Sequence, residues 1–300
     1  MNEVPEEVRA LLAERAERRA AKDFAAADAI RDRMADLGFR VVDGPEGQSL
    51  EPLADAPPEG PGRAADVASV LLEPATADVT VHWVVEGWAE DARRALDAFR
   101  DLEGGRVMQY VLVDLTEGDE DFGDDVEVLR LEPATGWASA RNAGLRRSRG
   151  QVVIAMDGSI EPTGEMLGPL ERTLADPTVG LCGPFGLTTR DLREFAESRG
   201  PEVDAIEGYC MAFRRELLTE VGAFDEKFRW YRTADIELSF RVKDAGYRCV
   251  VVEVPVRKHE HRMWQTTEPA ERDRLSKRNF YRFLERFRGR TDLLVDAPEG

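Results

Sequence analysis

Acidic side chains stand at the carboxyl ends of two predicted strands. Asp157 follows the apolar run 151–156 and begins the turn Asp157-Gly158-Ser159, while Asp114 lies near the end of the apolar run 107–115. In open α/β sheets a ligand binds beyond the carboxyl ends of the strands, so we expect both carboxylates at one ligand-binding edge. A carboxylate there can hold a hard divalent cation that neutralises a diphosphate group. For Asp157 taken alone, the capping of a turn is the favoured alternative.

Two of the three histidines, His259 and His261, follow the last predicted core strand. Side chains two residues apart project from the same side of an extended chain, so the two imidazoles could share a metal ion or a phosphate group. In a chain with so few histidines, a functional role and a structural role are equally open for this pair.

The composition limits the classes of partner. The chain has 41 basic and 59 acidic residues, a formal net charge of −18, and only three widely separated cysteines. This charge repels nucleic-acid backbones, so nucleic-acid binding is not expected, and the cysteines indicate neither a zinc ribbon nor a disulfide framework. We find no apolar stretch long enough to span a bilayer and expect a cytoplasmic protein. Peripheral membrane contact through the basic, aromatic segment 272–290 stays open, although a solvated amphipathic helix is favoured there.

The elements that must position these side chains alternate between residues 78 and 290. Strands are predicted at 79–85, 107–115, 126–131, 151–156, 206–213 and 247–254, and helices at 89–99, 138–149, 215–221, 235–245 and 269–288. Such alternation is typical of an α/β domain in which helices flank a mostly parallel sheet.

The first 48 residues have a different pattern. Apolar residues at helical spacing over 5–37, with Asp23 as a possible N-cap and Gly38 as a stop, predict an αα-hairpin followed by a short strand at 39–43. Residues 49–77 are rich in proline and glycine and read as a linker, and 291–300 as a tail.

Three blocks of the α/β region resemble family 2 glycosyltransferases with the GT-A fold. They are Gly136-Trp-Ala-Ser-Ala-Arg-Asn-Ala-Gly-Leu145, the segment from Gly208 to Phe228 that contains Met211, Arg214, Arg215 and Gly222-Ala-Phe-Asp-Glu, and the segment Ala234-Asp-Ile-Glu-Leu-Ser-Phe-Arg that ends at Gly246-Tyr247. They occur in the family's order, and the resemblance implies a GT-A domain over 78–290.

The resemblance also implies roles for individual residues. Asp157 would be the metal-facing acid of a D-x-D-like turn, with Ser159 in its second acidic position, and His259 would complete the metal site because its spacing from Pro255 fits better than that of His261. Asp235 would be the catalytic base. Contacts to the nucleotide sugar would come from Asp114, Arg141, Asn142, Asp157 and Ser159.

The implied reaction is the transfer of a sugar, with inversion, from a nucleotide-diphosphate donor to an acceptor hydroxyl, assisted by Mg²⁺ or Mn²⁺. The acceptor, whether a glycan, a lipid-linked or a small molecule, is not defined. This sequence departs from the family at Ser159, at Ala234 and at the end of the first strand, where Glu86-Gly87 replaces the usual Pro-x-Tyr-Asn/Arg ending. A GT-A protein that binds nucleotide sugars or acts as a scaffold without turnover is therefore the alternative.

The N-terminal hairpin resembles the C-terminal tail of cysteinyl-tRNA synthetase over 11–38 and 41–47. Residues 1–50 contain 8 basic and 11 acidic side chains, which does not favour tRNA binding. Docking or self-association is the expected role, and an RNA-associated adaptor is the less favoured one.

Overall fold

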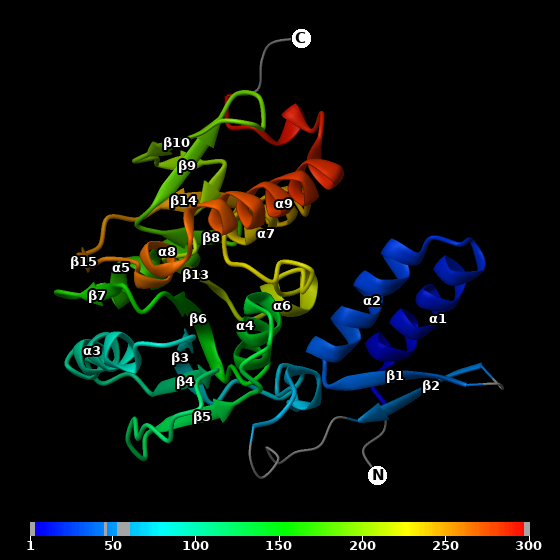
Figure 1. Ribbon diagram of the computed structural model, residues 1–300, viewed down its shortest axis with the longest axis horizontal. Coiled ribbons are helices and arrows are strands. Elements are labelled where there is room, and N and C mark those ends of the chain that lie inside the picture. The colour runs from blue at the N-terminus through cyan, green and yellow to red at the C-terminus, as the bar shows by residue number, and fades with distance from the viewer. Residues whose placement is uncertain (1–3, 45–46, 53–60, 297–300) are drawn as a thin grey trace.

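An eight-stranded sheet forms the centre of the molecule (Figure 1). The computed structural model describes residues 4–44, 47–52 and 61–296. The strand order is β11 (Glu202–Val203), β14 (Arg248–Val251), β8 (Val179–Gly183), β13 (Cys210–Arg214), β6 (Gly150–Met156), β3 (Ala77–Val85), β4 (Met108–Asp114) and β5 (Val126–Arg130). The parallel strands β6, β3, β4 and β5 form one half of the sheet, and β13 runs antiparallel between β6 and β8. The predicted α/β class with a mostly parallel sheet is confirmed.

Helices cover both faces of this sheet. On one face α3 (Ala89–Arg100) packs its apolar residues against β3, where Phe99 meets Trp83 edge to face with ring centroids 5.6 Å apart, and α5 (Leu167–Leu174) packs against β8 and β13. On the other face lie α4 (Trp137–Leu145), α6 (Leu217–Glu220) and α7 (Ala234–Asp244). Apolar residues at intervals of three and four on α3 explain why it forms an amphipathic helix there.

The C-terminal helices close the end of the sheet near β14. After the short α8 (Arg262–Thr266), α9 (Pro269–Phe287) buries Phe283 and Phe287 against Phe240 of α7. Two small sheets complete the domain: β10 (Phe195–Ser198), β9 (Gly186–Thr189) and β12 (Ala205–Ile206) form one, and β15 (Val256–Lys258) and β7 (Ile160–Pro162) the other. No helix of the described residues is long and apolar enough to cross a membrane.

One predicted strand is broken in the structure. The run 206–213 divides into β12 and β13, which belong to different sheets, and the residues between them bend past the start of α7. Gly208 lies at the bend, where a Cβ atom would be 3.4 Å from the Cβ of Asp235. The close approach of two segments, which a strand pattern does not reveal, accounts for the difference.

The N-terminal hairpin consists of α1 (Glu6–Ala20), α2 (Phe24–Asp36), β1 (Phe39–Gly44) and β2 (Gly47–Pro52). As predicted, the Asp23 carboxylate caps α2 by accepting the Ala26 N–H at 3.2 Å, and Gly38 at φ +87° ends it. The hairpin faces the α/β domain with the side that carries α2, which lies close to α6 (Figure 1). The Arg33 guanidinium donates to the Thr219 carbonyl at 2.6 Å.

Part of the segment predicted as a linker packs on the α/β domain. Ala64, in the 3₁₀ turn η1 (Ala64–Asp66), and Val67, Val70 and Leu71 are buried there. Pro57 and Pro58 of the same segment lie outside the described residues.

Candidate functional site

Three neighbouring strands each have an acidic residue at or directly after their carboxyl end, at one edge of the sheet. β3 is followed by Glu86, β4 ends at Asp114, and β6 is followed by Asp157. The parallel register that pairs Val85 with Asp114 places these ends side by side. The expectation that Asp114 and Asp157 share one edge agrees with this topology, and Glu86 joins them.

Asp157 is held as an ionised carboxylate. Its Oδ1 accepts the Ser159 N–H at 2.8 Å and the Ser159 hydroxyl, and its Oδ2 lies 3.2 Å from His261 Nε2. Burial alone would raise the pKa of Asp157, but the hydrogen bonds from His261 and Ser159 outweigh it and hold that pKa below its usual value. The carboxylate is therefore charged at neutral pH.

His261, and not His259, is the histidine beside Asp157. Its ring lies over Tyr231, with centroids 4.5 Å apart and planes inclined by 30°, and meets Tyr209 edge to face at 6.0 Å. His261 Nδ1 accepts the Trp264 N–H at 3.2 Å, so in the neutral ring Nε2 carries the proton that faces Asp157. Because β15 pairs with β7, His259 instead meets Glu161, its Nε2 lying 2.5 Å from that carboxylate. His261 starts α8, and the chain turns between the two rings.

The residues around Asp157 fit a cation that is shared with a phosphate ligand. Among the described residues no group of three or more His, Cys, Asp or Glu side chains is arranged to hold a metal ion. Asp157 and the Ser159 hydroxyl nevertheless offer one carboxylate and one neutral oxygen at a single point, and His261 Nε2 would add an imidazole nitrogen once it has lost the proton that faces Asp157. Mg²⁺-type ions take one or two carboxylates and complete their coordination with phosphate oxygens and water, so this donor set suits such a complex.

A narrow cavity of about 60 Å³ opens on the α3 side of Asp157. Glu86, Trp88, Arg141 and Arg262 are among the residues that line it. Burial raises the pKa of Glu86 to about 7, and the nearby Arg141 charge only partly opposes this. Trp88 has a left-handed backbone, with φ +52°, which presents its indole at the start of α3. Strained residues of this kind cluster at ligand sites.

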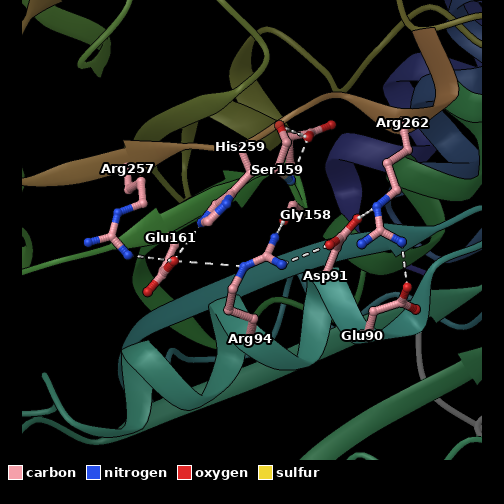
Figure 2. A network of polar contacts seen from close by, with 10 residues as sticks. Glu90, Asp91, Arg94, Gly158, Ser159, Glu161, Arg257, His259 and Arg262 are labelled. Carbon is pink, nitrogen blue, oxygen red and sulfur yellow. Dashed lines mark hydrogen bonds and ion pairs between the residues drawn. The ribbon is translucent and has the colours of Figure 1, made fainter. Parts of the chain in front are cut away.

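An ion-pair network fixes the wall of the narrow cavity (Figure 2). Arg262 contacts Glu90 and, at 3.2 Å, Asp91 on α3, so it ties the start of α8 to that helix. Arg94 pairs with Asp91 at 2.8 Å and donates to the Gly158 carbonyl at 3.2 Å, so α3 also holds the Asp157 turn. The segment that carries His261 is thus clamped over the strand ends by charges on α3.

Three predicted nucleotide contacts differ in their positions. Arg141 lines the narrow cavity and donates to His82 Nδ1 at 2.8 Å and to the Met156 carbonyl at 3.1 Å. Asp114 is buried, and its Oδ2 has no hydrogen-bond partner in the described part of the chain. Asn142 is turned away, toward the loop after α6, where it exchanges hydrogen bonds of 2.8 and 2.9 Å with the Phe224 backbone.

A second cavity, of about 290 Å³, adjoins the first. The two share Trp137, Asp157, Tyr231 and His261, and the far end of the second contains Glu207 and Asp235. As predicted, Asp235 lies at the start of a helix: it is in the first turn of α7, after the N-cap Thr233, and its carboxylate accepts the N–H groups of Gly208 and Ile236, at 2.8 and 2.9 Å. This second volume approaches that of a small-molecule site.

Glu86, Tyr231 and Glu207 are site residues that the sequence did not predict. Glu86 could have been found, because it follows its strand as Asp157 does. Glu207 lies near the beginning of the predicted strand 206–213, and the bend at Gly208 that turns it toward Asp235 depends on tertiary contact. Tyr231 precedes α7 in an irregular loop and gives no periodic signal.

Two sequence families match different parts of the chain. Residues 111–239 match glycosyl transferase family 2, and residues 1–49 match the cysteinyl-tRNA ligase anticodon binding domain. The chain is 26% identical over 235 residues to a pre-mycofactocin glycosyltransferase of Mycobacterium tuberculosis (strain CDC 1551 / Oshkosh), covering 66% of this chain and 48% of that protein. It is 52% identical over 63 residues to cysteine–tRNA ligase 1 of Burkholderia lata, covering 19% of this chain and 13% of the ligase.

The chain thus spans about half the length of the curated glycosyltransferase that it matches. Among solved structures, GalNAc-T7 with UDP, GalNAc and Mn²⁺ superposes with a TM-score of 0.53 at 18% identity, covering 70% of this chain and 48% of that one. This likeness supports the GT-A fold. Both resemblances inferred from the sequence are confirmed.

Proposed function

Because the chain carries a glycosyl transferase family 2 domain behind a segment homologous to the C-terminal region of cysteinyl-tRNA ligases, we propose that it transfers a sugar from a nucleotide-diphosphate donor to an acceptor hydroxyl. The proposal includes inversion at the sugar carbon and assistance by Mg²⁺ or Mn²⁺. One observation carries it: Asp157 with His261 at one end, and Asp235 at the other, line the same cavity.

The two ends of that cavity suit the two halves of a transfer reaction. At the first end, Asp157 and His261, with the Ser159 hydroxyl, would hold the cation, which neutralises the charge that develops on the leaving diphosphate. The narrow cavity beside them, with Arg141 and Glu86, would receive the nucleotide, and Asp114 would contact its base or ribose. The clamp of Arg262 on α3 implies that this cavity widens when the nucleotide enters.

At the second end, Asp235 would receive the proton of the acceptor hydroxyl. Burial raises the pKa of Asp235 against the opposing effect of its two backbone hydrogen bonds, and this direction makes the carboxylate a better proton acceptor. Tyr209, Tyr231 and Trp137 offer aromatic surfaces along the cavity for the substrates. The acceptor classes to test are glycans, lipid-linked molecules and small molecules, and the similar mycobacterial protein is named a pre-mycofactocin glycosyltransferase.

Calorimetric titration with UDP and with GDP, with and without Mn²⁺, tests the donor half of the proposal. We expect nucleotide binding that depends on the metal and that weakens at least about 100-fold in Asp157→Ala, since the variant removes the carboxylate that is proposed to hold the cation. His261→Ala should weaken binding about 10- to 100-fold.

His259→Ala is the matched control for this experiment. This histidine belongs to the same chain segment but pairs with Glu161 and not with Asp157, so nucleotide binding should change less than about 3-fold, as for the loss of a partly exposed pair. Stronger loss in His259→Ala than in His261→Ala would restore the assignment made from the sequence. Metal-dependent binding without transfer or hydrolysis of any nucleotide sugar would favour the catalytically degenerate alternative, and no nucleotide binding at all would refute both.

A further inference from the structure

A second carboxylate shares the far end of the larger cavity with Asp235. Glu207 lines this cavity from the bend between β12 and β13, next to Gly208, whose N–H is bound by Asp235. Within the described residues no side chain forms a hydrogen bond or an ion pair with the Glu207 carboxylate, although Glu207 is half-buried. A carboxylate that lines a cavity with its lone pairs free, beside a second carboxylate, is available to a ligand.

We infer that Glu207 is a second catalytic carboxylate, which contacts the acceptor hydroxyl together with Asp235 and holds the proton that this hydroxyl loses. The inference rests on the proposed function and refines it: the proton that the proposed function gives to Asp235 is taken up by the two carboxylates together and remains on Glu207. Asp235 is fixed by the Gly208 and Ile236 N–H groups, so it is suited to orienting the acceptor. Glu207 has its lone pairs free and is suited to taking up the proton.

The charges around Glu207 support this division of work. Burial, and next the Asp235 charge, raise the pKa of Glu207 to about 7, with a smaller contribution from Glu197 on β10. Lys258 on β15 and Arg232 before α7 act in the opposite direction. Both cations are engaged elsewhere: Lys258 Nζ lies 3.5 Å from the Tyr209 ring centroid, and the Arg232 guanidinium stacks at 4.9 Å on Trp264. A general base works best when its pKa is close to the working pH.

The proposed step balances in atoms and charge. The acceptor oxygen forms a bond to the anomeric carbon of the donor sugar, and the bond from that carbon to the β-phosphate oxygen breaks. The bonding electron pair leaves with the nucleoside diphosphate, which gains one negative charge. The acceptor proton moves to the carboxylate pair and remains on Glu207, which becomes neutral; it is released to solvent after the product leaves.

Turnover with water as the acceptor provides the first test. Release of UDP or GDP from UDP-glucose, UDP-galactose, UDP-N-acetylglucosamine and GDP-mannose, with Mn²⁺, is followed from about pH 5 to 9 in wild type, Glu207→Gln and Asp235→Asn. We expect Glu207→Gln to lower kcat/KM about 10- to 100-fold and to move the acidic limb of its pH profile to lower pH. UDP and GDP binding in calorimetry should be unchanged.

Glu197→Gln is the matched control. It removes an exposed acid whose charge also reaches Glu207 but which does not line the cavity, so kcat/KM should stay within about 3-fold of wild type. Wild-type rates and an unmoved acidic limb in Glu207→Gln would overturn the inference while leaving the proposed function intact. Lack of nucleotide binding in calorimetry would instead refute the proposed function.

A second measurement needs no turnover. In protein labelled with ¹³C at the glutamate carboxyl carbon, the Glu207 resonance is assigned by its loss in Glu207→Gln and then titrated. We expect a midpoint near 7 in wild type and a lower one in Asp235→Asn, because the neighbouring charge is removed. A midpoint near the ordinary glutamate value of about 4.3 in both proteins would overturn the inference, whatever the turnover experiment gives.

Discussion

Arg141 lies within helix α4 and Arg146 is the C-cap of the same helix. Both are almost fully buried, yet their surroundings differ. The Arg141 guanidinium donates only to neutral acceptors, His82 Nδ1 and the carbonyls of His82 and Met156. Arg146 pairs with the Asp36 carboxylate of the hairpin at 3.3 Å and donates to the Ala64 carbonyl. Arg141 thus faces neutral hydrogen-bond acceptors, whereas Arg146 faces the side chain of an acid.

This difference separates a residue of the site from a residue of the scaffold. Burial lowers the pKa of Arg141 to about 10, so it stays protonated at neutral pH, and its charge acts on Asp157 and Glu86 across the narrow cavity. Arg146 joins the hairpin, the 61–77 segment and α4 at one point. The comparison teaches that burial alone does not identify a functional arginine; the charge of its partners does.

The largest effect is expected from Arg146→Met. At a pH above about 7, where the Asp36 carboxylate is ionised, the substitution leaves it buried without its cation, which typically costs about 3–5 kcal/mol of stability. Urea denaturation should show this loss. Calorimetry without urea, at a temperature at which the variant is fully folded, should show unchanged UDP and GDP affinity. A clear loss of nucleotide affinity at normal stability would place Arg146 in the site and remove the distinction between the two arginines.

The pH dependence of stability tests the same pair from the other side. Burial raises the pKa of Asp36 to about 7, and the Arg146 charge only partly opposes this, with Glu226 and Asp32 adding to the rise. Between the ordinary value of 3.8 and about 7, the native state therefore holds a proton that the unfolded chain has lost. The free energy of unfolding should fall by roughly 2–4 kcal/mol as pH rises through this window, at about 1.4 kcal/mol per unit of pKa.

Asp36→Asn provides the control for that experiment. The variant cannot titrate at this position, so the fall in stability between about pH 4 and 7 should be much shallower than in wild type. Equal slopes in the two proteins would mean that Asp36 does not carry the effect and that its pairing with Arg146 keeps it ionised.

Much of the fold follows from local pattern. The strands β3, β4, β5 and β6 and the helices α3 and α9 were predicted within a few residues because each has a continuous apolar run or an amphipathic period. The Asp23 cap and the Gly38 stop follow from the local chemistry of helix ends. The elements α5, β8, β9 and β10 were not predicted, since segments of four to eight residues carry little periodic signal and become ordered through their contacts.

The site was harder to predict because it is assembled from distant segments. The sequence indicates Asp157 and Asp235, but which histidine meets Asp157 depends on the β15–β7 pairing and on the turn that starts α8. Asn142 was assigned to the nucleotide pocket together with Arg141, its neighbour in the sequence. On a helix, adjacent residues point about 100° apart, so the two side chains serve different sides of α4.

Asn142→Ala sharpens the comparison by testing the residue between the two arginines. Asn142 exchanges two hydrogen bonds with the Phe224 backbone in the interior, and its loss leaves those groups unpaired. We expect a fall in unfolding free energy of about 1–3 kcal/mol in urea denaturation, with UDP and GDP affinity per folded molecule unchanged. Weakened nucleotide binding at wild-type stability would instead support the contact to the nucleotide that the family resemblance implies.

The smallest effect, and the one that decides the role of Arg141, is expected from the pair Arg141→Met and Arg141→Lys. Both variants lose the fork of N–H groups that binds His82 and Met156, so both should lose similar stability. Only the methionine removes the positive charge at the narrow cavity, so its Mn²⁺-dependent affinity for UDP or GDP should fall about 10-fold, equivalent to about 1.4 kcal/mol, and that of the lysine variant less. Calorimetry on the two folded variants separates charge from packing, because their shared packing defect cancels in the difference. Equal affinities would mean that the Arg141 charge does not reach the nucleotide; both arginines of α4 would then belong to the scaffold, and the cation held at Asp157 would have to neutralise the diphosphate without help from this helix.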